Sequence, residues 1–152
     1  MRVYVAGPLS TGTYYEATKN IRHAIDVGEI LLSEGYAPYV PHYSHFWNLF
    51  HRHTWEAWMK LDYEWLRVCD ALLRLPGESK GADQEVKWAH TLGIPVCYTL
   101  EELDALRKHR KTNSTGPTTE TPSREYNNAG GPELRDHCPS VKPSDPGGVC
   151  CP

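Results

Sequence analysis

The sequence predicts an α/β fold in which helices cover both faces of a parallel sheet. Short apolar runs alternate along the chain with longer segments of helical periodicity, and Gly or Pro marks most of the boundaries between them. Neighbouring parallel strands need crossover connections, which the intervening helices supply. The chain of 152 residues is long enough for one such domain.

The first half of the chain contains two predicted strands with a long helix between them. Arg2–Ala6 is a run of β-branched and aromatic residues that ends at a Gly-Pro pair, as expected for a strand followed by a turn. Residues 16–34 place apolar side chains at helical spacing, and a glycine follows as the stop signal. Residues 37–40 form a second short strand, which a proline closes.

The second half repeats this alternation. Helical periodicity resumes over residues 55–68, and an apolar run at 71–75 predicts the third strand. After a Pro-Gly turn, a helix is expected at 82–92, a fourth strand at 94–98 and a last helix at 100–108. This order predicts a doubly wound sheet of four to five parallel strands, of the flavodoxin or Rossmann type.

The composition changes sharply near residue 110. Residues 111–152 are rich in Thr, Ser, Pro and Gly and poor in large aliphatic side chains, so burial cannot offset the entropy lost on ordering them. The sequence therefore predicts one folded domain over residues 1–110 and a disordered tail over 111–152.

Charge and hydropathy favour a small-molecule partner. The formal charge of -3 does not favour polymeric nucleic acid, because its binders concentrate Lys and Arg. No apolar run approaches the roughly 18 residues of a membrane span, and the chain starts directly with a strand pattern, without a leader. The five cysteines match neither a zinc module nor a disulfide framework. We expect a cytoplasmic protein that does not bind membranes.

Ligands of doubly wound sheets bind outside the carboxyl ends of the strands. The first such loop contains Gly7, Pro8, Leu9 and Ser10, whose backbone NH groups and hydroxyl precede a helix. A helix N-terminus favours an anion such as phosphate. An ordinary strand-to-helix turn is the alternative.

The loop after the third strand carries a candidate carboxylate. Two glycines and Ser79 precede the helix, and Glu85 is expected in the first helical turn, where the helix dipole stabilises a negative charge. A plain N-terminal helix charge is the alternative. Asp62 lies near the apolar stripe of the preceding helix and needs a partner or a function if it is buried. An exposed aspartate is equally compatible with the pattern. Two carboxylates on neighbouring elements suit glycosyl chemistry.

The segment from His42 to His53 is dense in rings and histidines, including His45 and Trp47. Its spacing resembles no zinc motif, so no metal site is expected. An aromatic wall that stacks a nucleobase fits this composition, and simple packing under a long loop is the alternative.

Three short blocks resemble the nucleoside 2-deoxyribosyltransferase-like superfamily, and most closely its 2-deoxynucleoside 5′-monophosphate N-glycosidases. They are Tyr4–Gly7, Asp62–Leu66 and Ser79–Glu85, and the resemblance covers residues 1 to about 106. It implies that Glu85 is the nucleophile that attacks the anomeric carbon of the sugar. Tyr4 then orients Glu85, and Asp62 contacts the sugar and assists departure of the base. No cofactor is expected.

The resemblance also bears on the substrate. The transferases carry an acid six residues before the nucleophile, whereas the monophosphate hydrolases carry serine there, as this chain does at Ser79. With Gly81 and Ser10, this serine favours a dianionic phosphate, which an acid would repel. A nucleoside 5′-monophosphate hydrolase is therefore expected. A base-exchanging deoxyribosyltransferase and a nucleotide-binding module without turnover are the alternatives. Relatives form dimers with shared sites, so a homodimer through residues 46–50 is expected.

Overall fold

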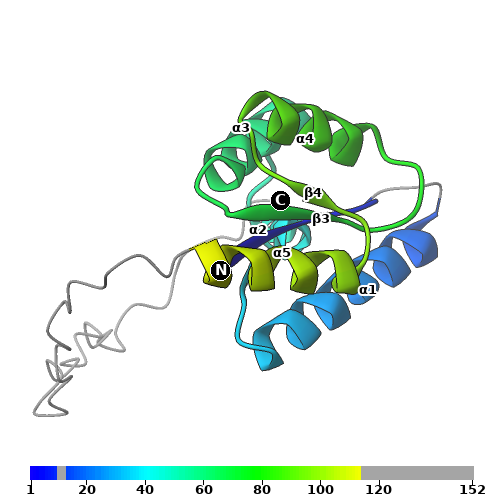
Figure 1. The fold of residues 1–152 in the computed structure, drawn as a ribbon. Helices are drawn as coiled ribbons and strands as arrows, with labels where there is room; N and C mark the ends of the chain where they lie inside the picture. The colour runs from blue at the N-terminus through cyan, green and yellow to red at the C-terminus, as the bar shows by residue number, and fades with distance from the viewer. Residues whose placement is uncertain (10–12, 114–152) are drawn as a thin grey trace, which may run out of the picture. The chain divides into compact units, whose positions relative to one another are not determined.

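The computed structural model of the chain describes residues 1–9 and 13–113. In chain order the elements are β1 (Arg2–Ala6), α1 (Tyr14–Ser33), β2 (Ala37–Tyr39), the 3-10 helix η1 (Pro41–Tyr43), α2 (Ser44–Phe50), α3 (Trp55–Leu66), β3 (Ala71–Arg74), α4 (Lys80–Thr91), β4 (Val96–Cys97) and α5 (Leu100–Asn113). The predicted α/β alternation is confirmed (Figure 1).

The four strands form one parallel sheet in the order β2-β1-β3-β4. Tyr4 is in register with Tyr39 of β2 and with Leu72 of β3, so β1 has a neighbour on each side. The chain leaves β1 for β2 on one side and then returns to β3 on the other. The loops after β1 and β3 therefore diverge at a topological switch point, where doubly wound sheets bind their ligands.

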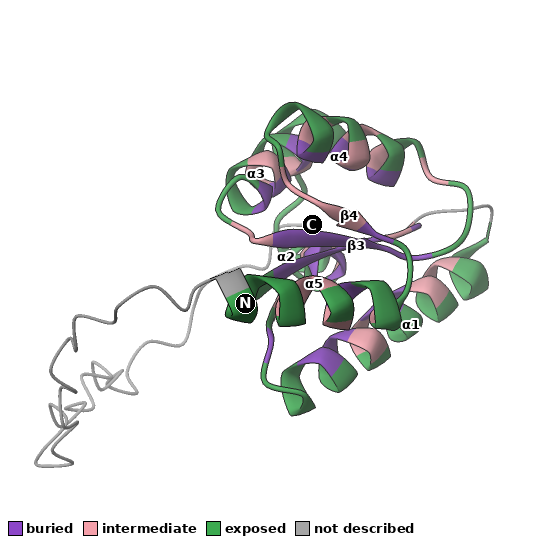
Figure 2. Ribbon diagram, in the orientation of Figure 1, coloured by how far each residue is buried: buried purple, intermediate pink, exposed green. Residues whose placement is uncertain are grey.

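Each face of the sheet packs against a different pair of helices (Figure 1). Val3 and Val5 of β1 project into the core beneath α1 and α5, whereas Tyr4 and Ala6 project into the core beneath α3 and α4. This alternation follows from the two-residue period of a strand. Figure 2 shows the central strands buried and the outward surfaces of the helices exposed.

Side-chain caps set several helix starts. Thr13 and Glu16 form a reciprocal capping box, so α1 begins two residues before the predicted start. Ser79 caps α4 by accepting a hydrogen bond from the amide of Ala82, and α4 therefore begins at Lys80. The prediction that Glu85 lies in the first turn is wrong, because this early cap moves it to the second turn. Asp83 is the acid of the first turn.

The aromatic segment differs from the loop that the sequence predicts. Residues 41–50 form η1 and then α2, a helix of seven residues without a buried side chain. Apolar residues do recur at helical spacing here, at Phe46, Trp47, Leu49 and Phe50, but seven residues are too few for periodicity to identify a helix. Of the expected tail, residues 111–113 continue α5, and the rest lies outside the described residues. No helix in the described ranges combines the length and hydropathy needed to cross a bilayer.

Candidate active site

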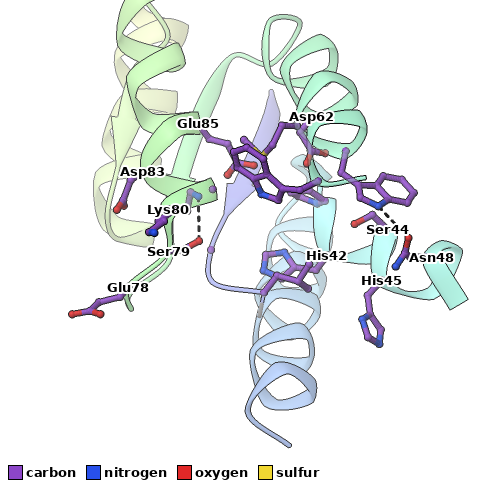
Figure 3. A pocket seen from close by; sticks show the side chains of 18 residues that line it. His42, Ser44, His45, Asn48, Asp62, Glu78, Ser79, Lys80, Asp83 and Glu85 are labelled. Atoms are coloured by element: carbon purple, nitrogen blue, oxygen red, sulfur yellow. Dashed lines mark hydrogen bonds between the residues drawn. The ribbon is translucent and has the colours of Figure 1, made fainter. Parts of the chain in front are cut away.

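A cavity of about 1010 Å³ lies at the carboxyl ends of β1 and β3. The loop after β1, the η1–α2 segment, one side of α3 and the start of α4 line it. Figure 3 shows the side chains of Glu85 and Asp62 entering this space from the two helices, with Ser79 and Lys80 at the start of α4. The cavity occupies the switch point that the sheet topology defines.

Glu85 lies on the buried face of α4, between Ala82 and Ala89. These two small residues are buried with it, and only 5% of the Glu85 surface is exposed. The Tyr4 hydroxyl, fully buried beneath it, donates a hydrogen bond of 2.7 Å to Glu85 Oε1. At this length a bond to a carboxylate is strong. The side chain of Glu85 is thus fixed from below while it lines the cavity.

Asp62 is the second buried carboxylate and lies on α3 in a stripe with Met59 and Leu66. It is 7% exposed and lines the same cavity. The Tyr39 hydroxyl donates to Asp62 Oδ1 at 3.5 Å, which is long for a hydrogen bond between oxygens. Asp62 is therefore held less tightly than Glu85.

Burial raises the pKa of both carboxyl groups. Burial, together with the nearby Asp62 carboxylate, raises the pKa of Glu85 from 4.5 to about 7, against the Tyr4 hydrogen bond and the charge of Arg74. Burial likewise raises the pKa of Asp62 from 3.8 to about 7, against the Tyr39 hydrogen bond. Of the two tyrosines, Tyr4 makes the shorter bond, so it favours the ionised form of its partner more strongly. The shorter bond thus favours the ionised form of Glu85 relative to that of Asp62, while burial raises both pKa values to about 7.

Arg74 fixes the loop between β3 and α4. Its guanidinium donates to the carbonyls of Leu75 and Gly77 and forms a 2.9 Å ion pair with Asp83 in the first turn of α4. The chain turns at Gly77 with a φ of 112°, a conformation that favours glycine. One buried cation thus joins the end of β3, the loop and the start of α4, and so sets where Ser79 lies.

His42 closes the floor of the cavity beside the first loop. Its Nε2 lies 3.1 Å from the Pro8 carbonyl, which can only accept, so Nε2 carries the hydrogen. Burial lowers the pKa of His42 below 6.5 and keeps the ring neutral at pH 7. The other ring nitrogen, Nδ1, is a buried acceptor without a partner among the described residues. A β-carbon at Gly7 would lie 3.4 Å from this ring and 3.2 Å from Leu75, so glycine keeps the two loops close.

The aromatic wall of the cavity comes from Trp55 and Trp58. The indole of Trp58 donates to Asn48 Oδ1 at 3.3 Å (Figure 3). Trp47 meets Trp58 edge-on, with ring centroids 5.6 Å apart, and is not among the lining residues. Trp47 therefore supports the wall from outside.

The structure brings most of the predicted site residues to this cavity. The predicted residues that line it are Gly7, Leu9, His42, His45, Asp62, Ser79, Gly81 and Glu85. Tyr4 lies beneath Glu85, and Pro8 is buried against Gly77. Ser10 lies outside the described residues. In the described part of the chain no three His, Cys, Asp or Glu side chains are grouped closely enough to hold a metal ion.

Sequence reasoning missed several residues of the site. Trp58 could have been predicted from the sequence, because it precedes Asp62 by one helical turn and so shares its face. Asn48 and Tyr39 could not, since their roles depend on contacts with another element. Arg74 is a charged residue inside an apolar strand, and such a pattern indicates a buried partner.

Fold and site together define a doubly wound α/β protein with two buried carboxylates under a cavity at the switch point. Residues 1–98 match the family described as a domain of unknown function (DUF4406). The chain belongs to this family.

A similar fold occurs in the solved structure of the 2-deoxyribosyltransferase from the psychrotolerant bacterium Bacillus psychrosaccharolyticus. The two structures superpose with a TM-score of 0.51 at 19% sequence identity, over 63% of this chain and 69% of that one. Comparison with curated protein sequences finds no significant match. The resemblance to deoxyribosyltransferases is thus confirmed for the fold.

Proposed function

We propose that this protein hydrolyses the N-glycosidic bond of a nucleoside 5′-monophosphate, with Glu85 as the nucleophile. The observation that carries the proposal is the buried 2.7 Å hydrogen bond from Tyr4 to Glu85, next to Asp62 on the same cavity. A carboxylate that is held from one side and open to a cavity on the other has the arrangement that a glycosyl nucleophile needs.

In the first step Glu85 attacks C1′ of the sugar, and the bond from C1′ to the base nitrogen breaks. The bonding electrons go to the base, which takes the proton from Asp62 and departs. In the second step water attacks C1′ and gives its proton to Asp62, and the ester bond to Glu85 breaks. The products are the free base and a sugar 5-phosphate, and both carboxyl groups regain their starting states.

The start of α4 offers a site for the phosphate. Ser79, Lys80 and Gly81 all line the cavity there. The Ser79 oxygen accepts from the amide of Ala82, so its hydroxyl hydrogen is available to a ligand. Helix N-termini favour anions through their free amides and dipole, and Lys80 adds a positive charge. The charge of Asp83 is paired with Arg74.

The opposite side of the cavity suits the base. Trp55 and Trp58 provide flat aromatic surfaces, and stacking on such surfaces tolerates different bases. A nucleobase presents a flat ring that can stack on them.

Base exchange is the second candidate function. One solved structure with this fold is a 2-deoxyribosyltransferase, and the same glycosyl-Glu85 intermediate could react with a second base in place of water. Only the acceptor in the second step distinguishes the two reactions.

The test is release of free base from a panel of ribo- and deoxynucleoside 5′-monophosphates, followed by chromatography, with and without an added acceptor base. We expect release without an acceptor and a loss of at least about 1,000-fold in Glu85→Gln. Mass spectrometry of an acid-quenched reaction should show the sugar phosphate bound to the wild-type protein. The proposal fails if no nucleotide is consumed, or if Glu85→Gln matches wild type. Product that forms only with an acceptor base supports the transferase.

We also propose that the protein forms a homodimer through the apolar surface of the η1–α2 segment. Its large apolar side chains are all exposed, namely Tyr43, Phe46, Trp47, Leu49 and Phe50. Monomeric proteins rarely expose contiguous apolar surface of this kind. Ser44, His45 and Asn48 of the same segment line the cavity, so a partner on this surface would border the site.

A further inference from the structure

Tyr39 on β2 repeats the position of Tyr4 on β1. The two residues are register partners in the parallel pair of strands, so their side chains project from the same face of the sheet. Their ring centroids lie 5.5 Å apart, and the Tyr39 ring stacks on Trp65 of α3 at 5.0 Å. Both rings are therefore fixed beneath the helices that carry the two carboxylates.

Each tyrosine hydroxyl meets one of the carboxylates. Tyr4 donates to Glu85 at 2.7 Å, and Tyr39 donates to Asp62 at 3.5 Å. Burial raises the pKa of Tyr39 well above 10, so its hydroxyl stays protonated and acts as a donor. The site thus contains two matched pairs of tyrosine and carboxylate, which differ in the length of the hydrogen bond.

We infer that Tyr39 is a positioning residue that holds the Asp62 carboxyl and, through a long hydrogen bond, leaves on it the proton that departs with the base. A short bond, like the one from Tyr4 to Glu85, would stabilise the Asp62 anion and so weaken the hold of the carboxyl group on that proton. The role in base departure rests on the proposed function. The link between Tyr39 and the protonation of Asp62 does not, and it is measurable in a protein without substrate.

Other charged groups also act on Asp62 and must stay constant in a test. Glu85 on α4 and Tyr4 on β1 face it from the packed elements. Five further titratable residues line the same cavity, namely His42, His45, Glu78, Lys80 and Asp83. A Tyr39→Phe substitution leaves all of them in place and retains the ring that stacks on Trp65.

The test is the titration of the Asp62 carboxyl by NMR in full-length protein labelled with ¹³C at aspartate Cγ, with Asp62→Asn to assign its signal. In Tyr39→Phe we expect the midpoint to rise by about 0.5 pH unit, because one stabilising contact of the anion is lost. Tyr36→Phe is the matched control. It removes the bond from Tyr36 to Asp104 beneath the other face of the sheet and should leave the midpoint of Asp62 unchanged.

A second variant should shift the titration midpoint of Asp62 in the opposite direction. With 3-fluorotyrosine at position 39 the hydroxyl is a stronger donor, so the Asp62 midpoint should fall below that of wild type. This substitution keeps the phenol and serves equally if Tyr39→Phe does not fold. An Asp62 midpoint that fails to rise in Tyr39→Phe, or that fails to fall with fluorotyrosine, overturns the inference.

The pH dependence of base release separates this inference from the proposed function. If Asp62 supplies the proton, the alkaline limb of kcat/KM moves upward in Tyr39→Phe by the same amount as the NMR midpoint, whereas Tyr4→Phe moves the acid limb. A shift of the NMR midpoint without base release in wild type rejects the glycosidase and retains the tyrosine pairing. Base release by wild type, together with an Asp62 midpoint that does not move in Tyr39→Phe, retains the glycosidase and rejects the tyrosine pairing.

Discussion

Glu85 and Asp62 lower the stability of the folded state when they carry charge, because both are buried. A carboxyl whose pKa is raised on folding contributes stability that is fully present below its unfolded pKa. That contribution is lost as the pH rises through the folded pKa. For Glu85 this loss occurs between pH 4.5, its unfolded pKa, and about pH 7, its folded pKa. Across this pH range the free energy of unfolding falls by about 3 kcal/mol on account of Glu85 alone.

A Glu85→Gln variant should therefore be more stable than wild type at pH 8. The amide carries no charge and can still accept the hydrogen bond from Tyr4. We expect a gain of about 1–3 kcal/mol in the free energy of unfolding at pH 8, which disappears near pH 4. Urea denaturation at the two pH values measures it. Glu29→Gln, at an exposed acid of α1, should show no such pattern. A Glu85→Gln variant that is less stable than wild type at pH 8 would contradict the account of burial.

A Gly81→Ala substitution tests whether a phosphate binds at the start of α4. A β-carbon there would lie 3.7 Å from Met59 Sδ and 3.8 Å from Ser79 Oγ, which are ordinary contacts. Gly81→Ala should fold normally and gain up to about 1 kcal/mol, since alanine favours helix. We expect KM for a nucleoside monophosphate to rise at least about 10-fold, because the methyl group blocks close approach to the backbone. Steady-state kinetics with the matching unphosphorylated nucleoside is the control, and an unchanged KM for the monophosphate would argue against this site.

At the level of elements, Arg74 joins β3 to α4 through the loop that contains Ser79. Its side chain is 10% exposed, whereas that of its partner Asp83 is 61% exposed. The two ends of the same ion pair are thus expected to contribute unequally. The buried guanidinium satisfies two backbone carbonyls, and the exposed carboxylate is screened by water.

Arg74→Met should lower the free energy of unfolding by about 2–3 kcal/mol, because it leaves the loop carbonyls without their donor. Asp83→Asn should lower it by less than about 1 kcal/mol. Chemical denaturation of the two variants under one set of conditions provides the comparison. Equal losses would mean that the guanidinium acts only through its ion pair.

At the level of the whole molecule, the apolar surface of η1 and α2 predicts self-association. Phe50, at the end of α2, is 82% exposed, so a substitution there should not disturb the core. We expect light scattering to find a dimer for wild type and a monomer for Phe50→Asp, since a charge inside an apolar interface is unfavourable. Leu32→Asp, at an exposed leucine of α1, is the control and should remain dimeric. A wild-type protein that stays monomeric at high concentration would contradict the proposal.

Periodicity in the sequence predicted every strand and the four long helices. It failed for α2, because a helix of seven residues is too short for apolar spacing to distinguish it from a loop. It also misplaced the start of α4, because the cap at Ser79 depends on one side-chain hydrogen bond and not on a repeating pattern. Local patterns identify long elements with a repeated apolar face, and they do not identify very short helices or the residues that cap a helix.

The sequence by itself determined the order of elements and the loops at the rim of the sheet, and it indicated Glu85 and Asp62 as candidate site residues. The tertiary structure decided that Tyr4 reaches Glu85 across 81 residues of sequence, and that Tyr39 lies beside Tyr4 and reaches Asp62. It also decided the burial that raises both pKa values to about 7. The physical reason is that helical and strand periods arise between neighbours in the chain. Register, burial and charge coupling arise between residues that meet only when the sheet and its helices pack.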